Sequence, residues 1–188
     1  TFHPAESDGF DNVDLGLQWQ WHGIPSPYWY FLDARNSALR LYSVDQAEGW
    51  RNLGDSPNLL LQKTPADKFT VTAKLRFIPN PQLKEKGESC GFVLMGQDYA
   101  VIKMTDTSEG VVLQYAECED ALKGKQENIF RTVPLSSEPL PVPYSNSYMS
   151  TTVPPVSPVA YMASDVYVRM KVMPEDRKGN VPDLTARF

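Results

Sequence analysis

The chain has 188 residues and a mass of 21.2 kDa, with 41% hydrophobic and 22% charged residues. This composition excludes a disordered tail, a coiled coil and a collagen-like chain, and the length predicts a single domain over residues 1–188. The net charge of −5 argues against a nucleic-acid partner, and no apolar stretch is long enough to predict a membrane partner.

Alternation of apolar and polar residues predicts strands that each bury one face. It occurs at 15–21, 39–41, 69–77 and 166–172, and in the first of these it places Trp19 and Trp21 in the core beside Leu15 and Leu17. More apolar runs at 91–95, 99–104 and 111–115, with turns at 96–98 and 105–110, predict a central meander. Only 116–125 suggests a short helix.

Two regions stand apart from this pattern. Residues 134–164 hold seven prolines and no glycine, so we expect a long loop there rather than a strand or helix, packed in part through its tyrosines and methionines. Residues 184–188 alternate like a strand that has only begun, and the sequence opens at Thr1 without a methionine or an apolar signal segment. Both ends therefore suggest a processed chain or a piece of a longer one, truncated at the C-terminus.

The sequence offers few residues for catalysis or metal binding. Its two histidines, His3 and His22, have no zinc spacing, and no hydrolase elbow or phosphate loop occurs, so we predict no catalytic residue and no metal. Glu117, Glu119 and Asp120 are acidic, but the spacing of acids in 117–120 indicates a solvated strand end. We also predict no cofactor. The alternative is a structural calcium ion bound by Asp8, Asp11 and Asp14.

Two cysteines, Cys90 and Cys118, are too few for a disulfide framework. Both lie in strand-like runs, which favours buried free thiols. A disulfide between neighbouring strands is the alternative.

Loop 22–30 is the best candidate for ligand contact. Two prolines stiffen it, and its three consecutive aromatic residues cannot all point inwards, so at least one is expected to be exposed. The candidates for contact with carbohydrate are His22, Tyr28, Trp29 and Tyr30. A loop packed beneath 134–164 is the alternative.

Several segments, taken in order, resemble a known family. They are the L-Q-W-Q-W motif within 15–21 after S-D-G-F at 7–10, followed by 38–43, 58–64, 69–75, 91–94 with Tyr99, and 166–172. Together, over roughly 7–175, they resemble the C-terminal concanavalin A-like domain of family 43 glycoside hydrolases, the β-xylosidase and α-L-arabinofuranosidase group. The resemblance implies an all-β, antiparallel two-sheet β-sandwich (jelly roll), here lacking its last strands.

In that family, three acids on an N-terminal five-bladed propeller perform catalysis, and this chain does not contain that partner domain. The resemblance thus implies an accessory domain for xylan or arabinan breakdown, secreted or periplasmic. In some relatives the loop after the first sandwich strand adds an aromatic wall to the sugar pocket, a role that would fall to Tyr28 and Trp29. A free-standing carbohydrate-binding module that takes an oligosaccharide and a small jelly-roll glycosidase remain the alternatives.

Overall fold

The computed structural model describes residues 7–83, 86–135 and 165–173. Within these ranges the chain forms strands and two short 3₁₀ turns, and it holds no α-helix. The elements are β1 (Trp19–Trp21), β2 (Tyr30–Asp33), β3 (Ala38–Leu41), η1 (Leu53–Asp55), β4 (Leu60–Gln62), β5 (Phe69–Leu75), β6 (Ser89–Met95), β7 (Tyr99–Thr107), β8 (Gly110–Cys118), η2 (Ala121–Lys123), β9 (Asn128–Pro134) and β10 (Val166–Val172). All of these strands pair in antiparallel fashion, which confirms the predicted all-β class.

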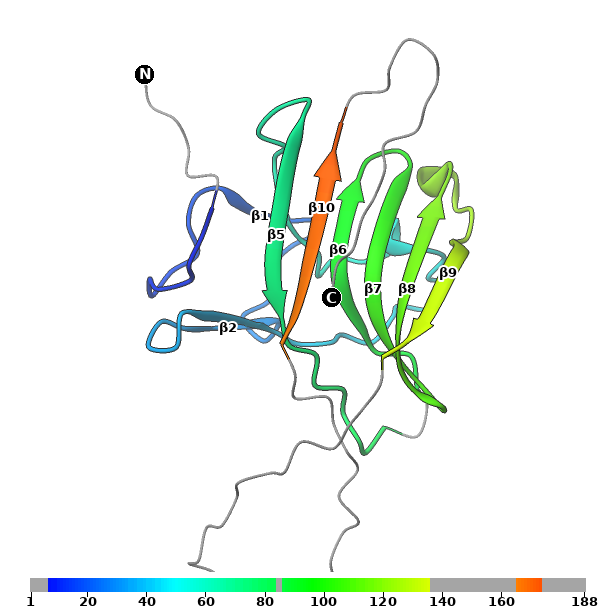
Figure 1. Cartoon of the computed structure of the whole chain (residues 1–188), viewed down its shortest axis with the longest axis horizontal. Helices are drawn as coiled ribbons and strands as arrows, with labels where there is room; N and C mark the ends of the chain where they lie inside the picture. Colours follow the sequence, from blue (N-terminus) through cyan, green and yellow to red (C-terminus); the bar gives the residue numbers. More distant parts are fainter. Residues whose placement is uncertain (1–6, 84–85, 136–164, 174–188) are drawn as a thin grey trace, which may run out of the picture.

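The main sheet is a meander in the order β6-β7-β8-β9 (Figure 1). Gly91 allows β6 to approach β7 closely, because a Cβ atom at this position would lie only 2.0 Å from the carbonyl oxygen of Ile102. A register shift between Tyr115 and Ala116 marks an irregularity in the β8–β9 ladder. The predicted meander is therefore correct in its strands and their order.

β5 and β10 form a separate ladder, in which Ala73 lies opposite Val168. Its inner face is apolar and its outer face carries threonine, lysine and arginine, as the alternation in both segments predicts. Asp165, directly before β10, forms ion pairs with Lys74 at 2.6 Å and with Arg76 at 2.7 Å. These ion pairs lower the pKa of the Asp165 carboxyl group. β10 lies beside β6 (Figure 1).

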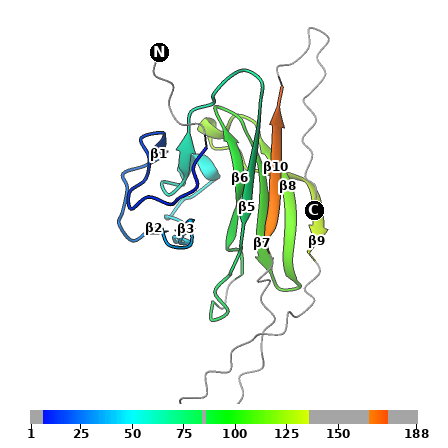
Figure 2. The same cartoon turned by 60° about the vertical axis from the view of Figure 1, so that its left-hand side comes forward.

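Residues 7–62 form an N-terminal layer in which β1 pairs with β4 and β2 pairs with β3. This layer lies on one side of the main sheet (Figure 2). Its link to the sheet is polar as well as apolar. The Leu53 backbone N–H donates to the Tyr99 hydroxyl at 3.1 Å, and that hydroxyl donates to Glu127 at 2.9 Å.

Two apolar clusters occupy the two faces of the main sheet, because successive residues of a strand point to opposite sides. One cluster joins the sheet to the β5–β10 ladder and the other faces the N-terminal layer. The first contains Phe77, Ile102, Met104, Leu113, Val166 and Val168, and the second contains Tyr99, Val101, Ala116, Cys118 and Ala121. The core is thus divided by the sheet.

The two cysteines are free, as the first of the two alternatives predicts. Cys90 packs against the first cluster and Cys118 belongs to the second, so their side chains lie on opposite faces of the sheet. This placement excludes a disulfide between them.

Three local predictions are wrong. The strand expected at 15–21 is limited to β1, because Trp19 N–H donates to the carbonyl of Gly16 in a turn, and Leu17 is fully exposed instead of buried. The turn expected at 105–110 is shorter, since Thr107 and Gly110 still pair. The helix suggested at 116–125 is reduced to η2, because 116–118 continue β8. The loop predicted over 134–164 begins after β9, which ends at Pro134. The rest of that prediction, over 136–164, and the strand predicted at 184–188 lie outside the described residues.

Candidate functional site

Loop 22–30 is held at its base by three hydrogen bonds to the segment before β4. His22 N–H donates to the Leu59 carbonyl at 2.9 Å, and Gly23 N–H donates to the Pro57 carbonyl at 2.9 Å. The His22 side chain adds a third bond, from Nδ1 to the carbonyl of Ser56 at 2.9 Å. Because a carbonyl can only accept, Nδ1 carries the proton. His22 therefore anchors the loop while its ring remains exposed.

The aromatic residues of the loop point in different directions. Trp29 and Tyr30 are half-buried, and each packs against Trp21 with ring centroids 5.5 Å apart. Tyr28, by contrast, is 85% exposed. The loop thus exposes one aromatic side chain on a base of packed ones, as expected, and contact of Tyr28, Trp29, His22 and Tyr30 with a ligand stays a prediction.

Large apolar side chains are exposed across the N-terminal layer. Leu17 and Ile24 are at least 90% exposed, and they accompany Val13, Tyr28, Phe31 and Leu41. Single exposed apolar residues are ordinary, but several from one layer are typical of a surface that meets another protein domain.

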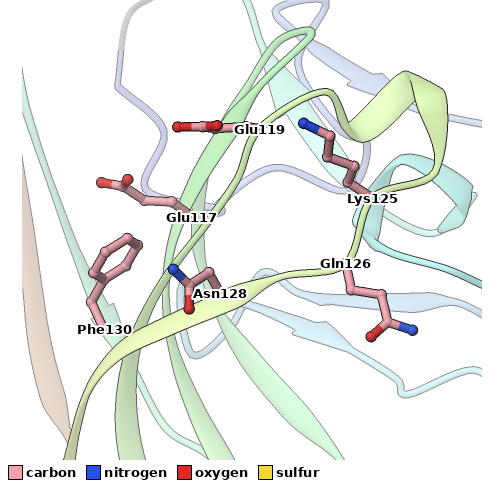
Figure 3. Close-up of a pocket in the computed structure, with 6 residues that line it drawn as sticks. All are labelled: Glu117, Glu119, Lys125, Gln126, Asn128 and Phe130. Carbon is pink, nitrogen blue, oxygen red and sulfur yellow. The ribbon is translucent and has the colours of Figure 1, made fainter.

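A second feature lies on the main sheet, at the end of β8 and the start of β9. It is a shallow hollow of about 220 Å³ lined by Glu117, Glu119, Lys125, Gln126, Asn128 and Phe130 (Figure 3). Glu117 stands opposite Asn128 in the ladder. In Figure 3 the carboxylates of Glu117 and Glu119 point to the same side, and Gln126 points away from Phe130.

Tyr115 organises one wall of the hollow. Its ring packs against Phe130, with centroids 6.0 Å apart and planes inclined by 38°, and its hydroxyl donates to Oε1 of Glu117. Burial and the neighbouring Glu117 carboxylate raise the pKa of Tyr115, so its hydroxyl remains a donor at neutral pH. Phe130 itself is 58% exposed.

The sequence analysis missed this hollow because it interpreted 117–120 as a solvated strand end. A signal was present, since Tyr115, Glu117 and Glu119 alternate with the small apolar residues Ala116 and Cys118, which predicts a polar and aromatic face on a strand. The partner strand β9, which supplies Asn128 and Phe130, carries no such motif.

The calcium alternative finds no support. Asp8 accepts hydrogen bonds from Phe10 N–H at 2.8 Å and from the indole of Trp19 at 2.7 Å, so it organises the turn before β1. Across the ranges that the structure describes, no group of three or more histidine, cysteine or acidic side chains is placed to hold a metal ion. The same ranges contain no helix that is long and apolar enough to span a membrane.

Comparison with known proteins gives one match. The family model of the beta xylosidase C-terminal concanavalin A-like domain, of family 43 glycoside hydrolases, matches residues 7–155, well over half of the chain. Neither a curated protein nor a solved structure matches. β10 lies beyond the matched range, although it completes the ladder of β5. Domains of the matched family follow the catalytic domain of their enzyme. The antiparallel sheets agree with the match, and the chain therefore belongs to the family of beta xylosidase C-terminal concanavalin A-like domains.

Proposed function

We propose that this accessory domain braces the catalytic propeller of a family 43 hydrolase and shapes its sugar pocket with loop 22–29. The enzyme acts on xylan or arabinan outside the cytoplasm, in a secreted or periplasmic location, and residues 1–188 act as a single non-catalytic domain. The observation that carries the proposal is the exposed Tyr28 on an anchored, proline-stiffened loop.

Anchoring matters because a loop that is already ordered loses little conformational entropy when it meets a sugar or a neighbouring domain. Trp29 N–H donates to the Ser26 carbonyl at 3.2 Å, and Tyr42 N–H donates to the Trp29 carbonyl at 2.9 Å. Trp29 and Tyr30 then pack on Trp21. These contacts support a division of roles, with Tyr28 as the contacting side chain and its neighbours as the support.

The exposed apolar side chains of the N-terminal layer support a docking role for that layer. Interfaces between domains of one enzyme bury surface that would otherwise be apolar and exposed. Leu17 and Ile24 lie in loops of this layer, and the side chains of both are almost entirely exposed to solvent. Docking through them would bring Tyr28 towards the catalytic domain.

The test is to replace Tyr28 with alanine in the enzyme that contains this domain and to measure kcat/KM on xylo- and arabino-oligosaccharides. Loss of one aromatic contact should reduce kcat/KM about fivefold to tenfold, mainly through KM. Tyr167→Ala is the matched control, because Tyr167 is also exposed, at 56%, but lies on β10. Unchanged kinetics in Tyr28→Ala would rule out the proposed role of the loop.

A carbohydrate-binding module that acts alone is the second candidate function. It is favoured by the hollow between β8 and β9, whose aromatic and polar lining lies on a different sheet from loop 22–30.

A further inference from the structure

We infer that the hollow at β8 and β9 is a separate binding site for one ring of a neutral sugar. The site itself does not depend on the role of loop 22–29. Only the choice of xylose and arabinose as the first probes rests on the proposed function.

The apolar wall of the hollow suits the C–H face of a sugar ring. Phe130 presents an exposed ring, and its packing against Tyr115 limits the orientations that this ring adopts. A restrained aromatic side chain offers contact area at a low cost in conformational entropy. The same arrangement explains why a large apolar side chain is kept exposed beside polar neighbours.

The polar wall suits sugar hydroxyl groups, which both donate and accept hydrogen bonds. Glu117 is oriented by the Tyr115 hydroxyl through Oε1, and its Oε2 remains an acceptor. Among the described residues, the side chains of Glu119 and Asn128 have no hydrogen-bond partner. Two carboxylates that accept and one amide that both donates and accepts match the pattern of neighbouring hydroxyls.

The charges at the rim favour a neutral sugar over an acidic one. Lys125 is paired with Asp120 at 3.0 Å, and Lys123 pairs with the same carboxylate at 2.8 Å. Lys125, the cation that lines the hollow, is therefore shared between Asp120 and Glu119, so the two glutamates of the lining outweigh its positive charge. A uronate would meet two carboxylates and a single lysine that is already paired.

The size of the hollow predicts weak binding. At about 220 Å³ it is smaller than the pockets of about 300–1,000 Å³ that enclose drug-sized ligands. One ring with few buried atoms gives an affinity in the millimolar range.

The experiment is an NMR titration of the full 188-residue chain with methyl β-xyloside, methyl α-arabinofuranoside and, as a charge probe, glucuronate. Saturable shifts are expected for the backbone amides of 115–119 and 126–130, with a millimolar Kd for the neutral glycosides. Glucuronate should bind at least fivefold more weakly than the neutral glycosides.

Phe130→Ala and Glu117→Gln should each weaken binding at least fivefold, because one removes the apolar wall and the other removes a charged acceptor. Ile129→Ala is the matched control, since Ile129 is 49% exposed and pairs with Ala116, which faces the opposite side of the sheet. It should leave the Kd unchanged. The spectrum of each variant shows directly whether it is folded.

Several outcomes would overturn the inference. They are the absence of saturable shifts at 115–119 and 126–130, equal weakening in Ile129→Ala, and hydrolysis of the glycosides, which would make the chain an enzyme. Shifts confined to 22–30 would also overturn it and would instead support the proposed function. Conversely, if Tyr28→Ala leaves the kinetics of the intact enzyme unchanged, the hollow is unaffected, so the two failures are distinguishable.

Discussion

The side-chain nitrogen of Asn52 donates a hydrogen bond of 2.9 Å to the carbonyl oxygen of Ala121, which lies 69 positions later in the sequence. The same nitrogen donates to the Lys125 carbonyl at 2.7 Å, and the side-chain oxygen accepts from Gly54 N–H at 2.8 Å. Asn52 is fully buried. One amide thus fastens η1 of the N-terminal layer to η2, which connects β8 and β9 of the main sheet.

Replacing Asn52 with leucine should destabilise the fold by about 3–5 kcal/mol. Leucine has a similar size, but it leaves the Gly54 N–H without a partner, at a cost of about 1–3 kcal/mol. It also removes one hydrogen bond, worth about 0.5–1.5 kcal/mol, from each of two carbonyls: that of Ala121, which still accepts from Gly124 N–H, and that of Lys125, which still accepts from the Cys118 thiol. Chemical denaturation followed by tryptophan fluorescence measures the loss. Asn12→Leu, at an exposed position, is the control and should change stability by less than about 0.5 kcal/mol. Equal stability of the two variants would contradict the fastening role of Asn52.

Removing only one partner of the ion pair between Lys103 and Glu127 should destabilise the fold. Both side chains are largely buried, with exposures of 16% and 11%, and Glu127 also accepts from Tyr99. Lys103→Met leaves a buried carboxylate without its cation and should cost about 3–5 kcal/mol. The double variant Lys103→Met, Glu127→Leu should recover part of this loss. A double variant less stable than the single one would show that the remaining charge is not the cause.

Cys90 should be unreactive in the folded protein. Burial raises the pKa of its thiol to about 12, so almost no thiolate exists at pH 8, and Cys118 is almost completely buried. Labelling with a thiol-specific reagent should modify neither residue in buffer and both in urea. Fast labelling of the native protein at pH 8 would contradict the burial of these thiols.

The same pKa has a consequence for stability at high pH. The folded-state value lies above the ordinary value of 9.0, so the stabilising contribution of Cys90 is fully present below pH 9 and is lost as the pH rises towards 12. Between these limits the free energy of unfolding should decrease by up to about 1.4 kcal/mol per pH unit because of this group. Cys90→Val removes the titrating group, and the difference in slope between the two proteins gives its contribution.

Trp29 and Tyr28 are neighbours whose replacement should affect stability to very different extents. Trp29→Ala removes a ring that packs on Trp21 and should destabilise the protein by about 2–4 kcal/mol. Tyr28→Ala removes an exposed ring and should change stability by less than about 0.5 kcal/mol. Thermal unfolding of both variants measures the difference. Similar melting temperatures would contradict the proposed roles, in which Trp29 supports the loop by packing and Tyr28 is free to contact a ligand.

The sequence predicts the strands with the clearest alternation well, and it is less reliable where the burial of a residue depends on a distant partner. The inner and outer faces of β5 and β10 follow from alternation because both segments bury one complete face, whereas alternation does not predict the pairing of these two strands. At 15–17 the same pattern misleads, since a turn precedes β1 and none of the described residues covers Leu17. The hollow escapes prediction because it exists only when Asn128 and Phe130 are placed beside Glu117 by the pairing of β9 with β8.

The distance in sequence between β5 and β10 has a consequence for the order in which the protein forms. The strands of the meander pair with their neighbours in the chain, so they need only short loop closures, whereas the partner of Ala73 is Val168. On the ribosome, at about 5–20 residues per second, β5 waits roughly 5–20 s for its partner to be synthesised. During that interval its apolar face and backbone edge are open to other chains, and the meander provides the structure on which β10 later closes the sheet.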